Sequence, residues 1–205
     1  TSVLVRHLFK KLPARRKFLK SASAESSRVA DLTSRLALAF PAVAFRLRVN
    51  NKETLHTPGN GNLLDTISCV YGSQTSNQML EVKDETADGY KIYGFVSIPS
   101  YTRSNRSYIT FFIGGRWVQS RTLTIALEEA YHGLLPQRRY PLAIIALSLP
   151  DKSVDVNIHP AKREVRFLQE NRVFSLVQRT VRETLVKVSP VAEIGFGTAS
   201  PQAGV

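Results

Sequence analysis

The near-continuous apolar run from Tyr140 to Leu149 restricts the fold of this chain more than any other feature. Such a run is typical of a strand that is covered on both faces, so it predicts a strand in the centre of a sheet. Residues 79–83 and 90–98 are two further strand patterns on either side of an acidic turn, and we expect them to pair. Residues 108–113 and 116–118, joined by two glycines, predict a strand, a tight turn and a short strand.

Apolar residues spaced three and four positions apart predict three amphipathic helices between these strands. The first carries Val29 to Phe40, with an N-cap at Ser26 or Ser27, and the second covers residues 122–134. The third carries apolar residues from 173 to 185. Strands and helices in this mixture indicate an α/β (α+β) fold.

The first 72 residues contain shorter patterns. Thr1 to Leu8 is β-rich and predicts a strand that has lost the partners preceding it, so the chain looks truncated at its start. Residues 43–49 and 54–57 predict a hairpin that turns at Asn50-Asn51. Asn62 predicts the cap of a short helix that stops at Gly72.

Composition limits the partners and the compartment. Lys and Arg number 28 against 16 Asp and Glu, which leaves a net charge of +12 and favours a polyanionic partner such as nucleic acid. A solvated basic face is the alternative. The single cysteine, Cys69, excludes an intrachain disulfide framework and fits a reducing, cytoplasmic compartment. No apolar run approaches the roughly 20 residues that span a bilayer, so we expect no membrane association.

The segment Asp155 to Phe167 reads as a strand, a stiff loop and a second strand. Pro160 fixes its own backbone and restricts His159, so Lys162 is expected on a rigid loop from which its charge can reach a phosphate oxygen. An exposed, solvated lysine and a hydrogen-bonded loop histidine are the alternatives. The sequence supports no metal site.

Three blocks in this order and spacing carry a family resemblance: LFKKLPARRKFLK (8–20), FFIGGRWVQSR (111–121) and DVNIHPAKREVRF (155–167). They resemble the signature blocks of MutL DNA mismatch-repair proteins, which are GHKL ATPases. The resemblance implies that residues 1–72 end an ATPase domain and that residues 73–188 form a transducer domain with a ribosomal-S5-like fold. It implies a sheet of about five strands, helices mainly on one face and a left-handed βαβ crossover. Residues 189–205, rich in Ser, Pro, Gly and Ala, would begin a flexible linker.

The resemblance also implies roles for individual residues. Lys162 would contact the γ-phosphate of ATP, and Thr1 would belong to a Gly-Thr motif that closes the nucleotide site. Arg121 and the neighbouring Arg116 would contact DNA, although an exposed turn is the ordinary alternative. Two further arginines match a family string and are candidates for DNA contact, or equally for ion pairs at a helix start: Arg15 and Arg16.

Departures from the family pattern limit what is expected of this chain. Lys10-Lys11-Leu12 replaces the usual Tyr-Asn-Thr, and Gly114 replaces an asparagine. The family's ATP-binding motifs do not occur in these residues, so we expect no ATP hydrolysis by this chain alone and no cofactor bound to it. In the intact protein the resemblance implies ATP and Mg²⁺, duplex or single-stranded DNA, the mismatch-recognition protein MutS, a homodimer and a nucleoid-associated location. A non-enzymatic RNA-binding α/β domain and the transducer of a type II topoisomerase are the alternatives.

Overall fold

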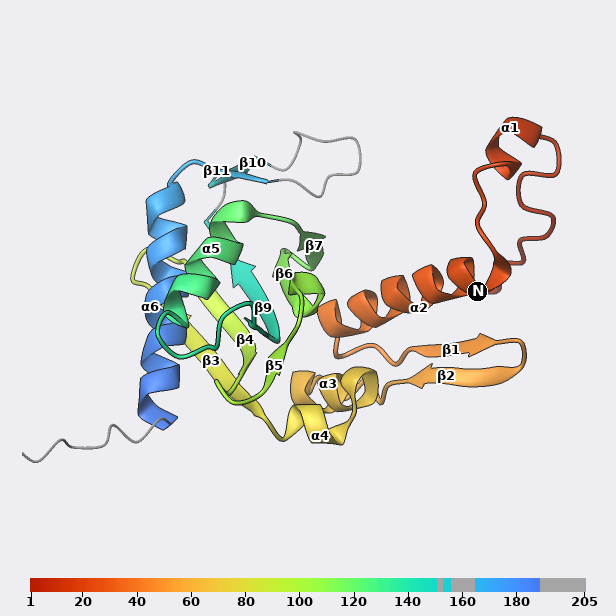
Figure 1. The fold of residues 1–205 in the computed structure, drawn as a ribbon. Helices are drawn as coiled ribbons and strands as arrows, with labels where there is room; N and C mark the ends of the chain where they lie inside the picture. The colour runs from red at the N-terminus through yellow and green to blue at the C-terminus, as the bar shows by residue number, and fades with distance from the viewer. Residues whose placement is uncertain (151–152, 156–164, 189–205) are drawn as a thin grey trace, which may run out of the picture.

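The computed structural model describes residues 1–150, 153–155 and 165–188, and its centre is a five-stranded mixed sheet in the order β3-β4-β9-β6-β7 (Figure 1). β9 occupies the middle of the sheet, as the apolar run predicted. It pairs antiparallel with β4 and parallel with β6, and the predicted pairing of β3 with β4 is also present. The five strands are β3 (Met79–Glu85), β4 (Lys91–Ser97), β6 (Ile109–Ile113), β7 (Arg116–Val118) and β9 (Ala143–Ser148).

Alternate residues of β9 supply two different cores, because successive side chains of a strand point to opposite faces. Ala143, Ile145 and Leu147 belong to the larger core, beneath α5 (Arg121–Ala130) and α6 (Glu170–Val188). Ile144 belongs to the smaller core on the other face, beside Leu38 of α2 (Ala22–Ala39) and residues of α3 (Leu63–Tyr71). Both faces of the central strand are therefore covered, which explains why it shows no polar alternation.

The larger core fixes α5 against the sheet. Leu123 and Leu127 of this helix are fully buried, and α5 also packs along α6. Just after the helix, the Tyr131 hydroxyl donates a hydrogen bond to the Ser97 carbonyl at the end of β4, and burial raises the pKa of this tyrosine. α5 lies in the connection between the parallel strands β6 and β9. The handedness of that crossover stays a prediction.

The first part of the chain extends away from the sheet (Figure 1). The predicted hairpin is present as β1 (Arg46–Val49) and β2 (Lys52–His56), and Asn50 and Asn51 make its turn with φ of 50° and 65°. Asparagine is among the few residues that tolerate this left-handed region. The predicted cap is present too: the Asn62 side chain accepts hydrogen bonds from the first amides of α3, which ends at Gly72. The short helix α4 (Ser73–Ser76) follows.

Two sequence predictions near the start are wrong. The structure has no strand between Thr1 and Leu8, and this segment is exposed with no neighbouring strand to pair with. α2 begins about five residues earlier than predicted, because the Ser21 hydroxyl accepts from the Ala24 amide and caps the helix. The short helix α1 (Pro13–Arg16) precedes it.

The remaining elements connect the larger ones. β5 (Thr102–Arg103) pairs with β8 (Tyr140–Pro141), and the 3-10 turn η1 (Arg106–Tyr108) leads into β6. β10 (Val154–Asp155) pairs with β11 (Arg166–Phe167) ahead of α6. Of the helices within the described residues, none is both long and apolar enough to cross a membrane.

Candidate nucleic-acid interface

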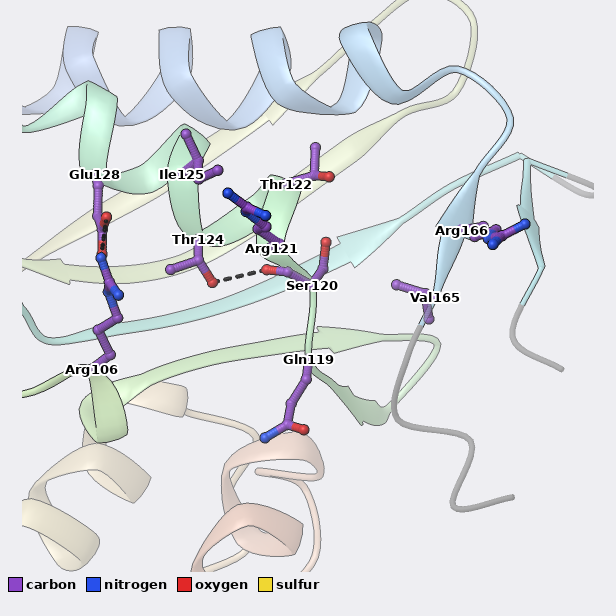
Figure 2. A pocket seen from close by; sticks show the side chains of 10 residues that line it. All are labelled: Arg106, Gln119, Ser120, Arg121, Thr122, Thr124, Ile125, Glu128, Val165 and Arg166. Atoms are coloured by element: carbon purple, nitrogen blue, oxygen red, sulfur yellow. Dashed lines mark hydrogen bonds and ion pairs between the residues drawn. The ribbon is translucent and has the colours of Figure 1, made fainter. Parts of the chain in front are cut away.

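An arginine-lined groove of about 640 Å³ lies at the N-terminus of α5 (Figure 2). It is formed by three segments that are distant in sequence: the turn before β6, the junction of β7 with α5, and the residues around β11. The groove is lined by Arg106, Gln119, Ser120, Arg121, Thr122, Thr124, Ile125, Glu128, Val165 and Arg166. Folding therefore brings together cations that the sequence separates by up to 60 positions.

Local hydrogen bonding determines where α5 begins and so where Arg121 lies. The Ser120 hydroxyl accepts from the Leu123 amide at 3.3 Å, which makes Ser120 the N-cap and Arg121 the first helical residue. The Thr124 hydroxyl donates to the Ser120 carbonyl at 2.8 Å. The first turn of α5 contains no acidic residue, so its unpaired amides and partial positive charge are not offset there by a carboxylate of the helix itself.

The arginines of the groove differ in how they are paired. Arg106 binds Glu128 through two hydrogen bonds of 2.5 and 2.9 Å, which raise the pKa of its guanidinium. Arg121 and Arg166 are both exposed, and the guanidinium of neither has a hydrogen bond or an ion pair with another described residue. Glu170, the nearby acid on α6, accepts a hydrogen bond from Thr122. The net positive charge of the groove therefore resides on Arg121 and Arg166.

The charge of this arrangement suits an anion. Two guanidinium groups without a described ion-pair partner, beside a helix N-terminus, favour an anion such as phosphate. Within the described residues, no cluster of three or more histidines, cysteines or acids could hold a metal ion. Among the described residues that line the groove there is no histidine, cysteine or lysine.

The residues predicted from sequence fall in different places. Arg121 lines the groove, whereas Arg116 is exposed on β7 and outside it. Arg15 and Arg16 are exposed on α1, which Figure 1 places at the other end of the molecule from α5. Thr1 is exposed, and no described hydrogen bond or pocket includes it. The predicted phosphate contact Lys162 and the neighbouring His159 lie outside the described residues.

The glycine that departs from the family pattern is compatible with its turn. Gly114 has φ of +56°, a conformation that asparagine also tolerates, so either residue suits this position. The next residue, Gly115, has φ of +74°, and an added Cβ would lie 2.9 Å from the Phe40 ring at the end of α2. A side chain at position 115 would therefore meet both backbone strain and a collision.

Sequence reasoning missed Arg166 and Arg106 as site residues. Arg166 lies within the block 155–167, but the family resemblance implies a role for Lys162 of this block and none for Arg166. Arg106 begins η1, and its ion pair attaches that turn to α5. No local sequence signal indicates the pairing of Arg106 with Glu128, because the two residues are 22 positions apart.

Comparison with known proteins agrees with the fold and with the motif blocks. The family described as DNA mismatch repair protein, C-terminal domain, matches residues 67–186. The MutL protein of Heliobacterium modesticaldum is 43% identical over 185 residues, which cover 90% of this chain and 28% of that protein. The MutL ATPase domain of Aquifex aeolicus, complexed with ADP, superposes with a TM-score of 0.55 at 29% identity and covers 71% of this chain and 51% of that one. The N-terminal domain of a DNA repair protein shares the fold, with a TM-score of 0.69 at 22% identity over 87% of this chain and 59% of that one.

The chain therefore belongs to the DNA mismatch-repair protein family. Its curated relatives are MutL proteins, which confirms the resemblance predicted from the three blocks and does not favour the RNA-binding or topoisomerase alternatives. The chain spans about a third or less of the length of these relatives. The division into domains at residues 72 and 188 stays a prediction.

Proposed function

We propose that this chain is the part of a MutL protein that contacts DNA through the groove at α5. The observation that carries the proposal is the pair of exposed arginines, Arg121 and Arg166, beside a capped helix N-terminus without an acidic residue in its first turn. Contacts of this kind are made to the phosphate backbone and carry no sequence information. They suit a repair protein that must accept DNA of any sequence near a mismatch.

The proposed role of ATP belongs to the intact protein. Of the two residues predicted to contact the nucleotide, Thr1 is exposed and Lys162 lies outside the described residues. ATP with Mg²⁺ would bind to the preceding ATPase region, and Lys162 would contribute a positive charge to its phosphates. In a full-length protein, Lys162→Ala is expected to weaken ATP binding, measured by titration with a fluorescent ATP analogue. An unchanged affinity would contradict this role.

The partners are likewise proposed for the intact protein. We propose a homodimer that engages MutS and DNA at the nucleoid when ATP is bound. The supporting observation is the family membership, which places the chain in DNA repair. Light scattering of the full-length protein with and without ATP tests the dimer, and co-sedimentation with MutS on mismatched DNA tests the partner. A monomer under both conditions would refute the proposed dimer.

The DNA-binding proposal is tested by fluorescence anisotropy of a labelled duplex over a salt series. Each phosphate contact contributes about 0.9 to the magnitude of the slope of log K against log salt. At 0.1 M salt this is about an eightfold gain in affinity relative to 1 M salt. Arg121→Glu is expected to lower the slope by about one and to weaken binding at least tenfold at 0.1 M salt, because it removes a contact and adds repulsion.

A matched control separates the groove from the overall charge. Arg46→Glu makes the same change in net charge on the exposed strand β1, which extends away from the sheet. Because exposed charges are largely screened beyond about 10 Å at 0.1 M salt, the control should bind nearly as well as the unaltered chain. If both variants bind equally well, or if the unaltered chain does not bind at low salt, the groove is not a DNA site.

A further inference from the structure

Two loops beside the groove are strongly basic. Residues 101–107 and 137–140 together contain four arginines and no acidic residue. The loops lie side by side, because β5 in the first pairs with β8 at the end of the second. Arg106, which lines the groove, belongs to the first loop, so the basic surface of the loops is continuous with the groove.

Aromatic and hydroxyl groups orient three of these arginines, Arg103, Arg106 and Arg139, and Arg106 also pairs with an acid. Arg139 donates to the Thr102 hydroxyl at 2.8 Å and to the Thr102 carbonyl at 3.0 Å. Arg106, besides its pair with Glu128, lies over the Tyr140 ring at 4.9 Å. Neutral partners such as Thr102 orient a guanidinium without cancelling its charge, so the charge of Arg139 remains available to a ligand.

Arg103 supports this arrangement from the inner side. Its guanidinium lies over the rings of Tyr101 and Tyr108, at 4.6 and 4.9 Å, and donates a hydrogen bond to the Tyr101 hydroxyl at 2.8 Å. Tyr101 in turn bonds to the Thr75 hydroxyl, and these hydrogen bonds outweigh burial and lower the pKa of the tyrosine. The loop that carries Arg106 is therefore anchored to α4 and does not depend on the bound ligand for its position.

We propose that Arg106, Arg138 and Arg139, called here the arginine ridge, form a second phosphate-binding surface that continues the DNA path beyond the groove. The proposal rests on the proposed function, since it extends the same site. Arg138 is the residue that a purely structural role explains least. It is exposed, it has φ of +58°, and no hydrogen bond or ion pair joins its side chain to another described residue.

The spacing of the groove and the ridge fits a duplex backbone. Arg106 contacts α5 at Glu128, seven residues after Arg121, which is about 10 Å along the helix axis. Phosphates of one DNA strand are spaced about 3.4 Å along the duplex axis, so this separation corresponds to about three phosphates. One strand of a straight DNA duplex could therefore extend from Arg121 to the arginine ridge.

The acids near this path offset only part of its charge. Glu128 is paired with Arg106, and Glu170, which accepts a hydrogen bond from the neutral Thr122 hydroxyl, keeps its negative charge. Glu129 on α5 is exposed and is the acid nearest to these in the helix. Because Arg106 is balanced by Glu128, we expect Arg138 and Arg139 to supply the net charge of the ridge.

The test is the anisotropy salt series with the variant Arg138→Gln/Arg139→Gln, measured beside Arg121→Gln. Losing two phosphate contacts is expected to lower the slope by about 1.8 and to weaken binding about 60-fold at 0.1 M salt. Arg139→Lys keeps the charge and loses the planar fork, so its slope should remain that of the unaltered chain. Arg46→Gln/Arg48→Gln on β1 removes the same charge away from the path and should leave the slope unchanged.

Each outcome has a distinct meaning. If Arg121→Gln lowers the slope and the double ridge variant does not, the ridge only stabilises its own loops and the proposal is overturned, while the proposed function stands. If neither variant changes the slope, the proposed function fails together with its extension. If the double variant does not fold, as judged by circular dichroism, Arg138→Gln alone decides, because it breaks no described contact: an unchanged slope overturns the proposal, and a decrease of about 0.9 supports it.

Discussion

Replacing Gly94 with alanine should strongly destabilise the chain. Gly94 lies in β4, where it pairs with Ile145 of β9. An added Cβ would lie 2.1 Å from the Ile144 carbonyl oxygen and 2.8 Å from the Ile145 Cα, both backbone atoms of the central strand. Since backbone cannot rotate aside as a side chain can, relief requires β4 and β9 to move apart by about 1 Å.

The magnitude follows from the interactions that such a movement would break. Overpacking of a core costs about 1–3 kcal/mol, and two weakened ladder hydrogen bonds add about 0.5–1.5 kcal/mol each. We therefore expect Gly94→Ala to lower the free energy of unfolding by about 2–6 kcal/mol, a large part of the 5–15 kcal/mol typical of a domain. Urea unfolding followed by circular dichroism measures this as a lower midpoint with an unchanged slope.

Gly133→Ala is the matched control, because nothing lies within 4 Å of the added Cβ and only the backbone conformation, with φ of +76°, opposes it. That conformation costs an alanine about 1–2 kcal/mol. The steric reasoning predicts a clearly larger loss at Gly94 than at Gly133. If the two variants lose equal free energy of unfolding, or if Gly94→Ala loses less than about 1 kcal/mol, the steric reasoning is refuted.

Two further predictions concern the cap of α5 and the pH dependence of stability. Ser120→Ala removes the N-cap hydroxyl and should lower the free energy of unfolding by about 1 kcal/mol, or the Tm by about 2–4 °C. Ser120→Thr keeps a hydroxyl and should retain most of this stability. Equal Tm values for the three chains would contradict the role of Ser120 as the cap. Burial would raise the pKa of Asp84, but hydrogen bonds from Arg179, the Glu85 amide and Thr180 outweigh it and lower the pKa below its ordinary value. This carboxylate therefore stabilises the fold above about pH 4, and its contribution is lost as the pH falls through the lowered pKa. Urea midpoints between pH 5 and 3 should decline less steeply in Asp84→Asn, and an identical decline would show that Asp84 does not contribute.

The sequence predicted those elements whose causes are local. The Asn50-Asn51 turn and the Asn62 cap depend on side chains within a few residues, and both are present. The central position of β9 depends only on its apolar run. The predicted strand at residues 1–8 failed because a strand is stable only with a partner, and no neighbouring strand is paired with it. The cap of α2 was misplaced because several serines precede the helix and only the Ser21 hydroxyl accepts from an amide of the first turn.

The candidate site could be predicted only in part, because the groove is assembled by the sheet. Arg121 was found through a family block, and the local cap at Ser120 explains its position. Total charge was a poor guide: residues 1–48 carry 11 basic and 2 acidic residues, but the groove contains none of them. Arg166 enters the groove because β11 leads into α6, which packs on α5. Such proximity follows from tertiary packing and leaves no pattern in the sequence.

The stability of the sheet and the geometry of the groove are connected through α5. The helix begins at the Ser120 cap beside the groove, and just past its end the buried Tyr131 hydroxyl bonds to Ser97 at the end of β4. A shift of β4 caused by an alanine at Gly94 would therefore reach both the end of α5 and, through its rigid axis, Arg121. The DNA affinity of a folded Gly94→Ala chain should consequently fall even though no groove residue is changed, whereas Gly133→Ala, which makes no collision, should leave the affinity intact.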